Sequence, residues 1–96
     1  MEDLFEWDDD KERSNRHKHG VSFKEALSVF DDKYAVLIPD PDQSDGEERF
    51  VFIGLSAKIR ILVVCHCYRE SGSVIRIISA RKATRTERFK YEEMIS

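Results

Sequence analysis

The stretch Ile75-Arg76-Ile77-Ile78-Ser79-Ala80-Arg81-Lys82-Ala83-Thr84 is the part of the chain that most constrains its fold. Its apolar first half predicts a β-strand, which runs directly into closely spaced cations. Thr84 and Glu87 then have the spacing of a capping box, which predicts a helix start. An arginine at the end of a stiff strand can hold a phosphate through paired hydrogen bonds, although such a residue is more often solvated or ion-paired.

The residues before this strand predict a β-meander. Strands are expected at residues 48–55, 59–69 and 73–80, and the connections at 56–58 and 70–72 are short enough for antiparallel hairpins. A further strand is expected at 34–38. The polar, proline-interrupted segment 39–46 cannot continue it and is expected to be a loop.

Helix signals flank the meander on both sides. A short strand at residues 4–7 is followed by Asp8 to Asp10, which cap a helix that runs to about Lys18 and ends at Gly20. Ser22 and Glu25 form a capping box for a second helix, which ends near residues 31–32 and is predicted to pack with the first as a hairpin.

These elements predict one α+β domain over residues 1–96. The predicted order is a short N-terminal strand, a two-helix hairpin, a four-stranded antiparallel meander and a C-terminal helix. Because the helices are expected to cover one sheet face and leave the other partly available, the available face is where a ligand is expected.

The composition fits a single domain without a membrane span. Ninety-six residues with 41% apolar content suffice for one hydrophobic core. The longest apolar run, residues 59–67, is far shorter than the roughly 20 residues that a membrane span needs. The acidic N-terminus lacks the pattern of a secretory signal, so a cytoplasmic location and no membrane partner are expected.

Charge divides unevenly along the chain. Residues 1–50 carry a net charge of −8 and residues 51–96 carry +5, for a total of −3. An acidic chain is unsuited to indiscriminate nucleic-acid binding. The basic second half still allows a local cationic site, or a surface for a charged protein partner.

The sequence predicts neither a metal site nor a cofactor. Cys65 and Cys67 point to the same face of a strand, and His66 between them points to the other. No second ligand pair accompanies them, so buried structural thiols are expected. The many carboxylates cluster in helix starts and loops, which disfavours a metal-dependent nuclease.

Several segments, taken together and in order, resemble the BrnT toxins of bacterial type II toxin-antitoxin modules, which are small ribonucleases of RelE-like fold. The resemblance covers nearly the whole chain. It is carried by Phe5-Glu6-Trp7-Asp8, Lys11, Asn15, Lys18-His19-Gly20-Val21-Ser22-Phe23, Glu48-Arg49-Phe50, Ile53-Gly54, residues 75–81, Ala83-Thr84, Glu87 and Tyr91.

This resemblance implies a cytoplasmic toxin that cleaves RNA without a metal and inhibits translation. It also implies neutralisation by a cognate BrnA-like antitoxin, with which the toxin would form a heterotetramer. Contact with DNA would be indirect, through the antitoxin's DNA-binding domain at the promoter that the pair represses.

The position of basic residues in RelE-like clefts suggests site residues. The catalytic candidates are Arg60, Arg81, His19 and Glu48. The RNA-binding candidates are Lys18, Arg49, Arg76 and Trp7. Cleavage needs an activated 2′-hydroxyl, a stabilised phosphorane and a protonated leaving oxygen. Fixed guanidiniums serve the second need, and His19 or Glu48 is the candidate for proton transfer.

Four alternatives remain open at this stage. His19 also fits a helix C-terminus, and Trp7 also fits a hydrophobic core. Unbroken strand alternation would place Arg76 and Arg81 on opposite faces, so both could not line one cleft. A chain whose main task is to bind an antitoxin and support promoter repression, with little nuclease activity, would fit the same residues.

Overall fold

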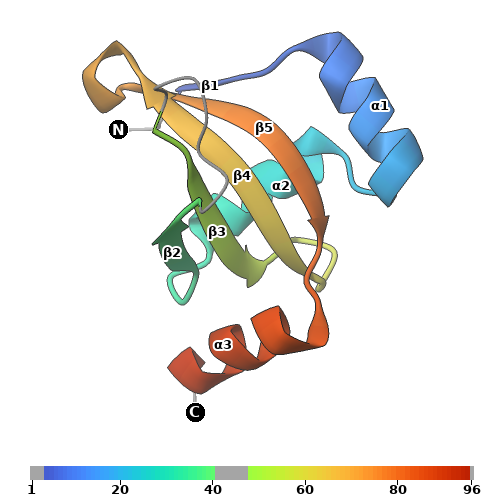
Figure 1. Cartoon of the computed structure of the whole chain (residues 1–96), viewed down its shortest axis with the longest axis vertical. Helices are drawn as coiled ribbons and strands as arrows, with labels where there is room; N and C mark the ends of the chain where they lie inside the picture. The colour runs from blue at the N-terminus through green and yellow to red at the C-terminus, as the bar shows by residue number, and fades with distance from the viewer. Residues whose placement is uncertain (1–3, 41–47, 96) are drawn as a thin grey trace.

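The strands form a single sheet in the part of the chain that the computed structural model describes, residues 4–40 and 48–95. Five strands lie in the order β1-β5-β4-β3-β2 (Figure 1). Their bounds are β1 Leu4–Glu6, β2 Val36–Pro39, β3 Phe50–Leu55, β4 Ile61–Arg69 and β5 Val74–Lys82. Strands β2 to β5 pair antiparallel in chain order, and β1 pairs parallel with β5. The mixed α+β class is confirmed, and the placement of β1 beside β5 is an addition to the prediction.

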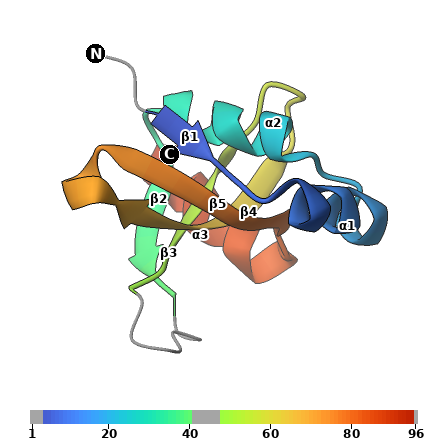
Figure 2. The same ribbon diagram turned by 90° about the horizontal axis from the view of Figure 1, so that it is seen from above.

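Helices lie on both sides of this sheet (Figure 2). On one side are α1 (Asp9–His19), α2 (Phe23–Leu27) and the 3-10 turn η1 (Ser28–Asp31). On the other side lies α3 (Arg85–Ile95), so the prediction that the helices cover one sheet face is wrong. A second 3-10 turn, η2 (Glu70–Gly72), connects β4 to β5.

The predicted helix caps are confirmed. The Asp8 side chain accepts hydrogen bonds from the backbone N–H groups of Asp10 and Lys11, and Gly20 ends α1 with φ 69°, which favours glycine. The Ser22 hydroxyl accepts from the N–H of Glu25 at 3.0 Å. At the start of α3, Thr84 and Glu87 exchange reciprocal side chain to backbone hydrogen bonds of 2.8 and 3.3 Å.

The predicted packing of the first two helices on each other is wrong. Helix α1 lies mainly against β5, and α2 contacts η1 and β5. The side chain of Asn15, buried in α1, accepts from the Ala80 N–H at 3.1 Å and donates to the Ala80 carbonyl at 2.8 Å. Asn15 thereby pairs with the part of β5 that lies beyond β1, and it fixes α1 to the sheet. Helix α1 contacts α2 through a hydrogen bond of 3.3 Å from the Phe23 N–H to the Glu12 carboxylate.

Two apolar clusters hold the described layers together. The larger lies between the sheet and α1, α2 and η1, with Phe23, Leu62 and Ile77 fully or almost fully buried. The smaller lies between the sheet and α3, and Tyr91 is the α3 residue in it. The Tyr91 hydroxyl donates to Asp32 at 2.6 Å, so α3 is anchored to the end of η1 as well as to the sheet.

Element boundaries differ from the sequence prediction by a few residues. Strand β2 starts later than predicted and includes Pro39, which sits at the end of an edge strand where a missing N–H is tolerated. Most of the loop predicted at 39–46 falls outside the described residues. Within the described ranges, no helix is long and apolar enough to cross a membrane.

Candidate functional site

A β-bulge in β5 determines which arginines share a sheet face. Cys65 pairs with Ser79 and His66 pairs with Ile77, so Ile78 is the extra residue. Ile77 belongs to the cluster on the α1 side, whereas Ile78 packs on the α3 side. The bulge shifts the alternation by one residue, and Arg76 and Arg81 therefore lie on the same face. The prediction from unbroken alternation is wrong for this reason.

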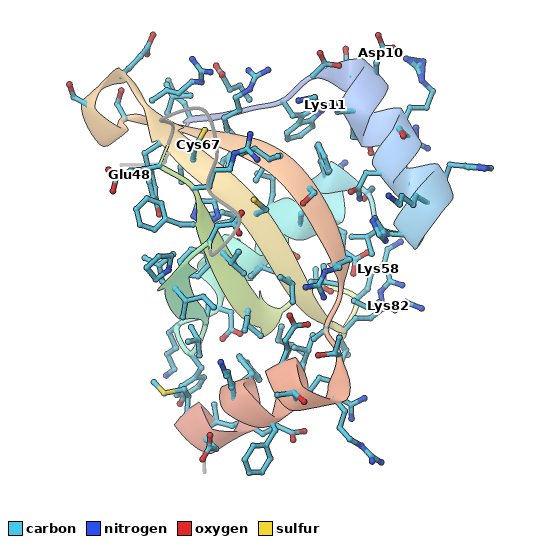
Figure 3. All side chains as sticks on the ribbon, in the orientation of Figure 1. Asp10, Lys11, Glu48, Lys58, Cys67 and Lys82 are labelled. Atoms are coloured by element: carbon cyan, nitrogen blue, oxygen red, sulfur yellow. The ribbon has the colours of Figure 1, made fainter. Side chains whose placement is uncertain are left out.

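Arginines from neighbouring segments lie on the α3 side of the sheet together with Arg76 and Arg81. Arg76 is opposite Cys67, and Arg69 follows Cys67 by two residues in β4. Arg49 lies two residues before Val51, which packs on the α3 side, and its charge opposes the rise in the Cys65 pKa. We call the surface formed by Arg49, Arg69, Arg76 and Arg81 the arginine face. Figure 3 shows that its end near Cys67 lies away from α3, which crosses the other end of the sheet.

Carboxylates hold the guanidiniums of this face in place. Glu6 accepts a 2.7 Å hydrogen bond from Arg76 Nη1, and Arg69 Nε lies 3.7 Å from the same oxygen. Arg81 binds Glu87 through two hydrogen bonds of 2.7 and 2.8 Å, and these bonds, with others from Thr84, lower the pKa of Glu87 to about 2. All these side chains stay partly exposed, so the guanidiniums are oriented and still reachable from solvent.

Arg69 and Glu6 belong to this site, although no local sequence pattern indicates it. Only the strand register connects them with the other residues, because β1 pairs Glu6 with Arg76. Glu6 and Arg76 are 70 residues apart, and without the position of β1 nothing in the sequence connects them.

The thiols of this face are structural, as their positions predict. Cys65 and Cys67 are buried and unpaired with each other, and both lie on the α3 side. Burial, together with a 3.2 Å hydrogen bond to Asp40, raises the pKa of Cys65 to about 12. His66 is fully buried on the opposite side, where burial lowers its pKa. Among the described residues, no three potential metal-ligating side chains converge.

Arg60 does not lie with Arg81. It precedes β4 and turns to the α2 side, where its guanidinium forms two hydrogen bonds with Glu25 and a third, of 3.1 Å, with the Gly20 carbonyl. The Glu25 side chain is only 2% exposed and also accepts from Ser56 at 2.7 Å. Burial would raise the pKa of Glu25, but the bonds from Arg60 and Ser56 outweigh it and hold the pKa below its usual range. Arg60 is thus occupied by a structural ion pair.

The other predicted site residues are dispersed. Lys18 is exposed and His19 half-buried at the C-terminus of α1, where cations complement the helix dipole. Trp7 packs edge-to-face on Phe23 at 5.9 Å in the larger cluster, which favours its role in the core. Glu48 is exposed just before β3 and points away from the sheet (Figure 3). Of the predicted residues, Arg49, Arg76 and Arg81 share the α3 side of the sheet, with Arg76 and Arg81 four register positions apart.

Comparison with known proteins identifies the family. Residues 7–87 match the family described as "Ribonuclease toxin, BrnT, of type II toxin-antitoxin system". The crystal structure of the ribonuclease toxin BrnT of Brucella abortus superimposes with a TM-score of 0.66, at 21% identity, covering 88% of this chain and all of the other. No curated protein sequence matches the chain. The structural likeness concerns the fold, and the family match covers most of the sequence: the chain belongs to the BrnT family of ribonuclease toxins of type II toxin-antitoxin systems.

Proposed function

We propose that this chain is an endoribonuclease toxin that binds and cleaves RNA on the arginine face, by metal-independent transesterification on a variant of the RelE-like fold. The observation that carries the proposal is the bulge in β5, because it places Arg76 and Arg81 on one face. Arginines from separate segments then surround a site that α3 leaves partly uncovered. Paired guanidinium donors suit the non-bridging oxygens of a phosphodiester.

The chemistry of the face fits the demands of the reaction. Cleavage adds negative charge to the phosphorus as the 2′-oxygen attacks, and fixed guanidiniums stabilise that charge. Arg76 and Arg69, which share Glu6, take this role in the proposal, and Arg49 and Arg81 hold the flanking phosphates. Glu6 lies beside Arg69 and Arg76, so in the proposal it accepts the 2′-hydroxyl proton in place of Glu48 or His19, and water at this exposed face supplies the proton that the leaving 5′-oxygen takes up.

The remaining parts of the proposal follow from family membership. A type II toxin has an antitoxin protein as its partner. We propose that a BrnA-like antitoxin neutralises this chain in the cytoplasm as a heterotetramer, and that the complex contacts promoter DNA through the antitoxin alone. RNA cleavage by the free toxin would then inhibit translation.

One observation favours a weaker nuclease. Arg76 and Arg81 are each ion-paired with a carboxylate of the chain itself, so RNA must compete with Glu6 and Glu87 for the guanidiniums. If Glu6 and Glu87 keep the guanidiniums and RNA does not displace them, the chain acts mainly as an antitoxin-binding and promoter co-repressing module. This second candidate predicts a tight antitoxin complex with little or no RNA cleavage.

RNA cleavage in excess chelator tests the proposal. The purified chain is expected to cleave a mixed-sequence RNA equally well with and without the chelator. The expected products carry 2′,3′-cyclic phosphate and 5′-hydroxyl ends, because the 2′-oxygen is the nucleophile. Cleavage that stops in chelator would contradict metal independence, and no cleavage by the folded chain would favour the second candidate.

A further inference from the structure

The hairpin between β3 and β4 holds an isoleucine in an unfavourable conformation. Ser56 donates its N–H to the Arg60 carbonyl at 2.8 Å, and Ile59 donates its N–H to the Ser56 carbonyl at 2.9 Å. These bonds close a short loop whose last residue, Ile59, has φ 59°. Glycine is the usual residue at such a position, because a β-branched side chain is strained there.

Packing within the chain does not explain this isoleucine. The Ile59 side chain is 81% exposed, the largest exposed fraction among the large apolar residues described. The chain therefore bears backbone strain and an exposed apolar surface at the same residue. Strain of this kind is retained where function requires it, so it raises the question of what Ile59 contacts in a complex.

Ile59 borders a surface pocket of about 390 Å³ between the hairpin and α3. Leu55, Ile61 and Ala83 supply its apolar lining, and Lys82 and Arg88 stand at its edge. Both cations are exposed, and neither forms an ion pair with another residue of the ranges 4–40 and 48–95. Figure 3 shows Lys82 and Lys58 at this end of the sheet, so a third cation lies nearby.

The side chains that line this pocket indicate which kind of molecule it binds. Single-stranded RNA is commonly held by stacking on aromatic rings, and none of the described side chains that line this pocket is aromatic. Arg60 also lines the pocket but is paired with Glu25, which leaves Lys82 and Arg88 as its available cations. Aliphatic side chains beside such cations suit a protein segment that offers an apolar side chain and flanking carboxylates. The surface thus favours a protein partner over RNA.

We propose that the pocket bordered by Ile59, Lys82 and Arg88 is the docking site for an acidic amphipathic segment of the antitoxin. The inference rests on the proposed function for the existence of that partner. Ile61 and Ala83 in the lining pack on the α3 side of the sheet, the side on which Arg81 lies, so an occupant that extends from the pocket along β5 covers one end of the arginine face. Docking here would therefore also obstruct the approach of RNA.

Two variants test the pocket by calorimetric titration with the cognate antitoxin. Ile59→Gly is expected to weaken binding about 10-fold or more, while its Tm stays the same or rises because the strain at this residue is removed. Lys82→Glu/Arg88→Glu is expected to weaken binding similarly. The matched control Lys11→Glu/Arg13→Glu has the same change in charge on exposed residues of α1 and should bind normally.

RNA cleavage by the same preparations, without antitoxin, separates the possible outcomes. Weaker antitoxin binding with unchanged cleavage is the expected result. Unchanged binding by both variants would overturn the docking site, and unchanged binding with reduced cleavage would make the pocket an RNA surface instead.

If the unaltered chain does not bind the antitoxin, the partner assigned under the proposed function is wrong, and the docking site is wrong as well. If the unaltered chain binds the antitoxin without cleaving RNA, only the nuclease proposal fails.

Discussion

A chain carrying both Arg76→Ala and Arg81→Ala is expected to cleave RNA about 10³-fold more slowly than the unaltered chain. Loss of one preorganised donor to a developing oxyanion typically costs about 10²- to 10³-fold in rate. Arg76 should account for most of the loss as a donor to the phosphorane, and Arg81, four register positions away, should add a smaller loss because it holds a flanking phosphate. The measurement is the single-turnover rate of cleavage of one RNA at saturating protein.

Two further variants test whether the loss of cleavage is specific to Arg76 and Arg81. Lys11→Ala/Arg13→Ala removes the same number of cations from the exposed surface of α1 and should keep the unaltered rate within a few-fold. Lys18→Ala/His19→Ala tests the cluster at the C-terminus of α1 that the sequence also suggested. A large loss in this second variant, with normal cleavage by Arg76→Ala/Arg81→Ala, would move the active site to the C-terminus of α1. Thermal melting confirms that each variant is folded.

Replacing Arg60 with alanine is expected to lower the free energy of unfolding by about 3 kcal/mol, because the variant leaves the buried Glu25 carboxylate without its charged partner. Urea denaturation measures the loss. Arg16→Ala is the matched control, since Arg16 pairs with Glu12 while its own side chain stays 53% exposed, and it should cost less than about 1 kcal/mol. The double variant Glu25→Gln/Arg60→Met should recover much of the stability, since no buried charge remains.

The effect of pH gives a second measure of the same ion pair. The pKa of Glu25 in the folded chain is below its ordinary value of 4.5, so the pair contributes stability above that pH and loses it as the pH falls further. The destabilisation caused by Arg60→Ala should therefore shrink in acid, where Glu25 is protonated in both chains. A loss that is equally large at pH 7 and at low pH would mean that packing, rather than charge, explains the role of Arg60.

Local signals in the sequence predicted most of the secondary structure. The caps at Asp8, Ser22 and Thr84 depend only on residues within three or four positions, and each forms as predicted. The opposite orientations of Cys65 and His66 follow from strand alternation in the same way. Such features need no knowledge of distant parts of the chain.

The composition of the candidate site depended on long-range features that the sequence does not specify. The bulge at Ile78 places Arg76 and Arg81 on the same sheet face, whereas regular alternation would place them on opposite faces. No residue type within β5 indicates the bulge. Glu6 reaches Arg76 only because β1 adds to the free edge of β5. Arg60 resembles a cleft arginine in sequence, and its bond with Glu25 across 35 residues becomes visible only in the fold.

RNA is proposed to occupy the arginine face, and the most direct test is an NMR titration of the isotope-labelled chain. The ligand is a short RNA whose 2′-hydroxyls are methylated, so that it binds without being cleaved. Backbone signals of β5 and β4 around Arg76, Cys67 and Ser79 are expected to shift, and those around Lys18 and His19 in α1 are not. Shifts confined to α1 and the Arg60 region would contradict this proposal.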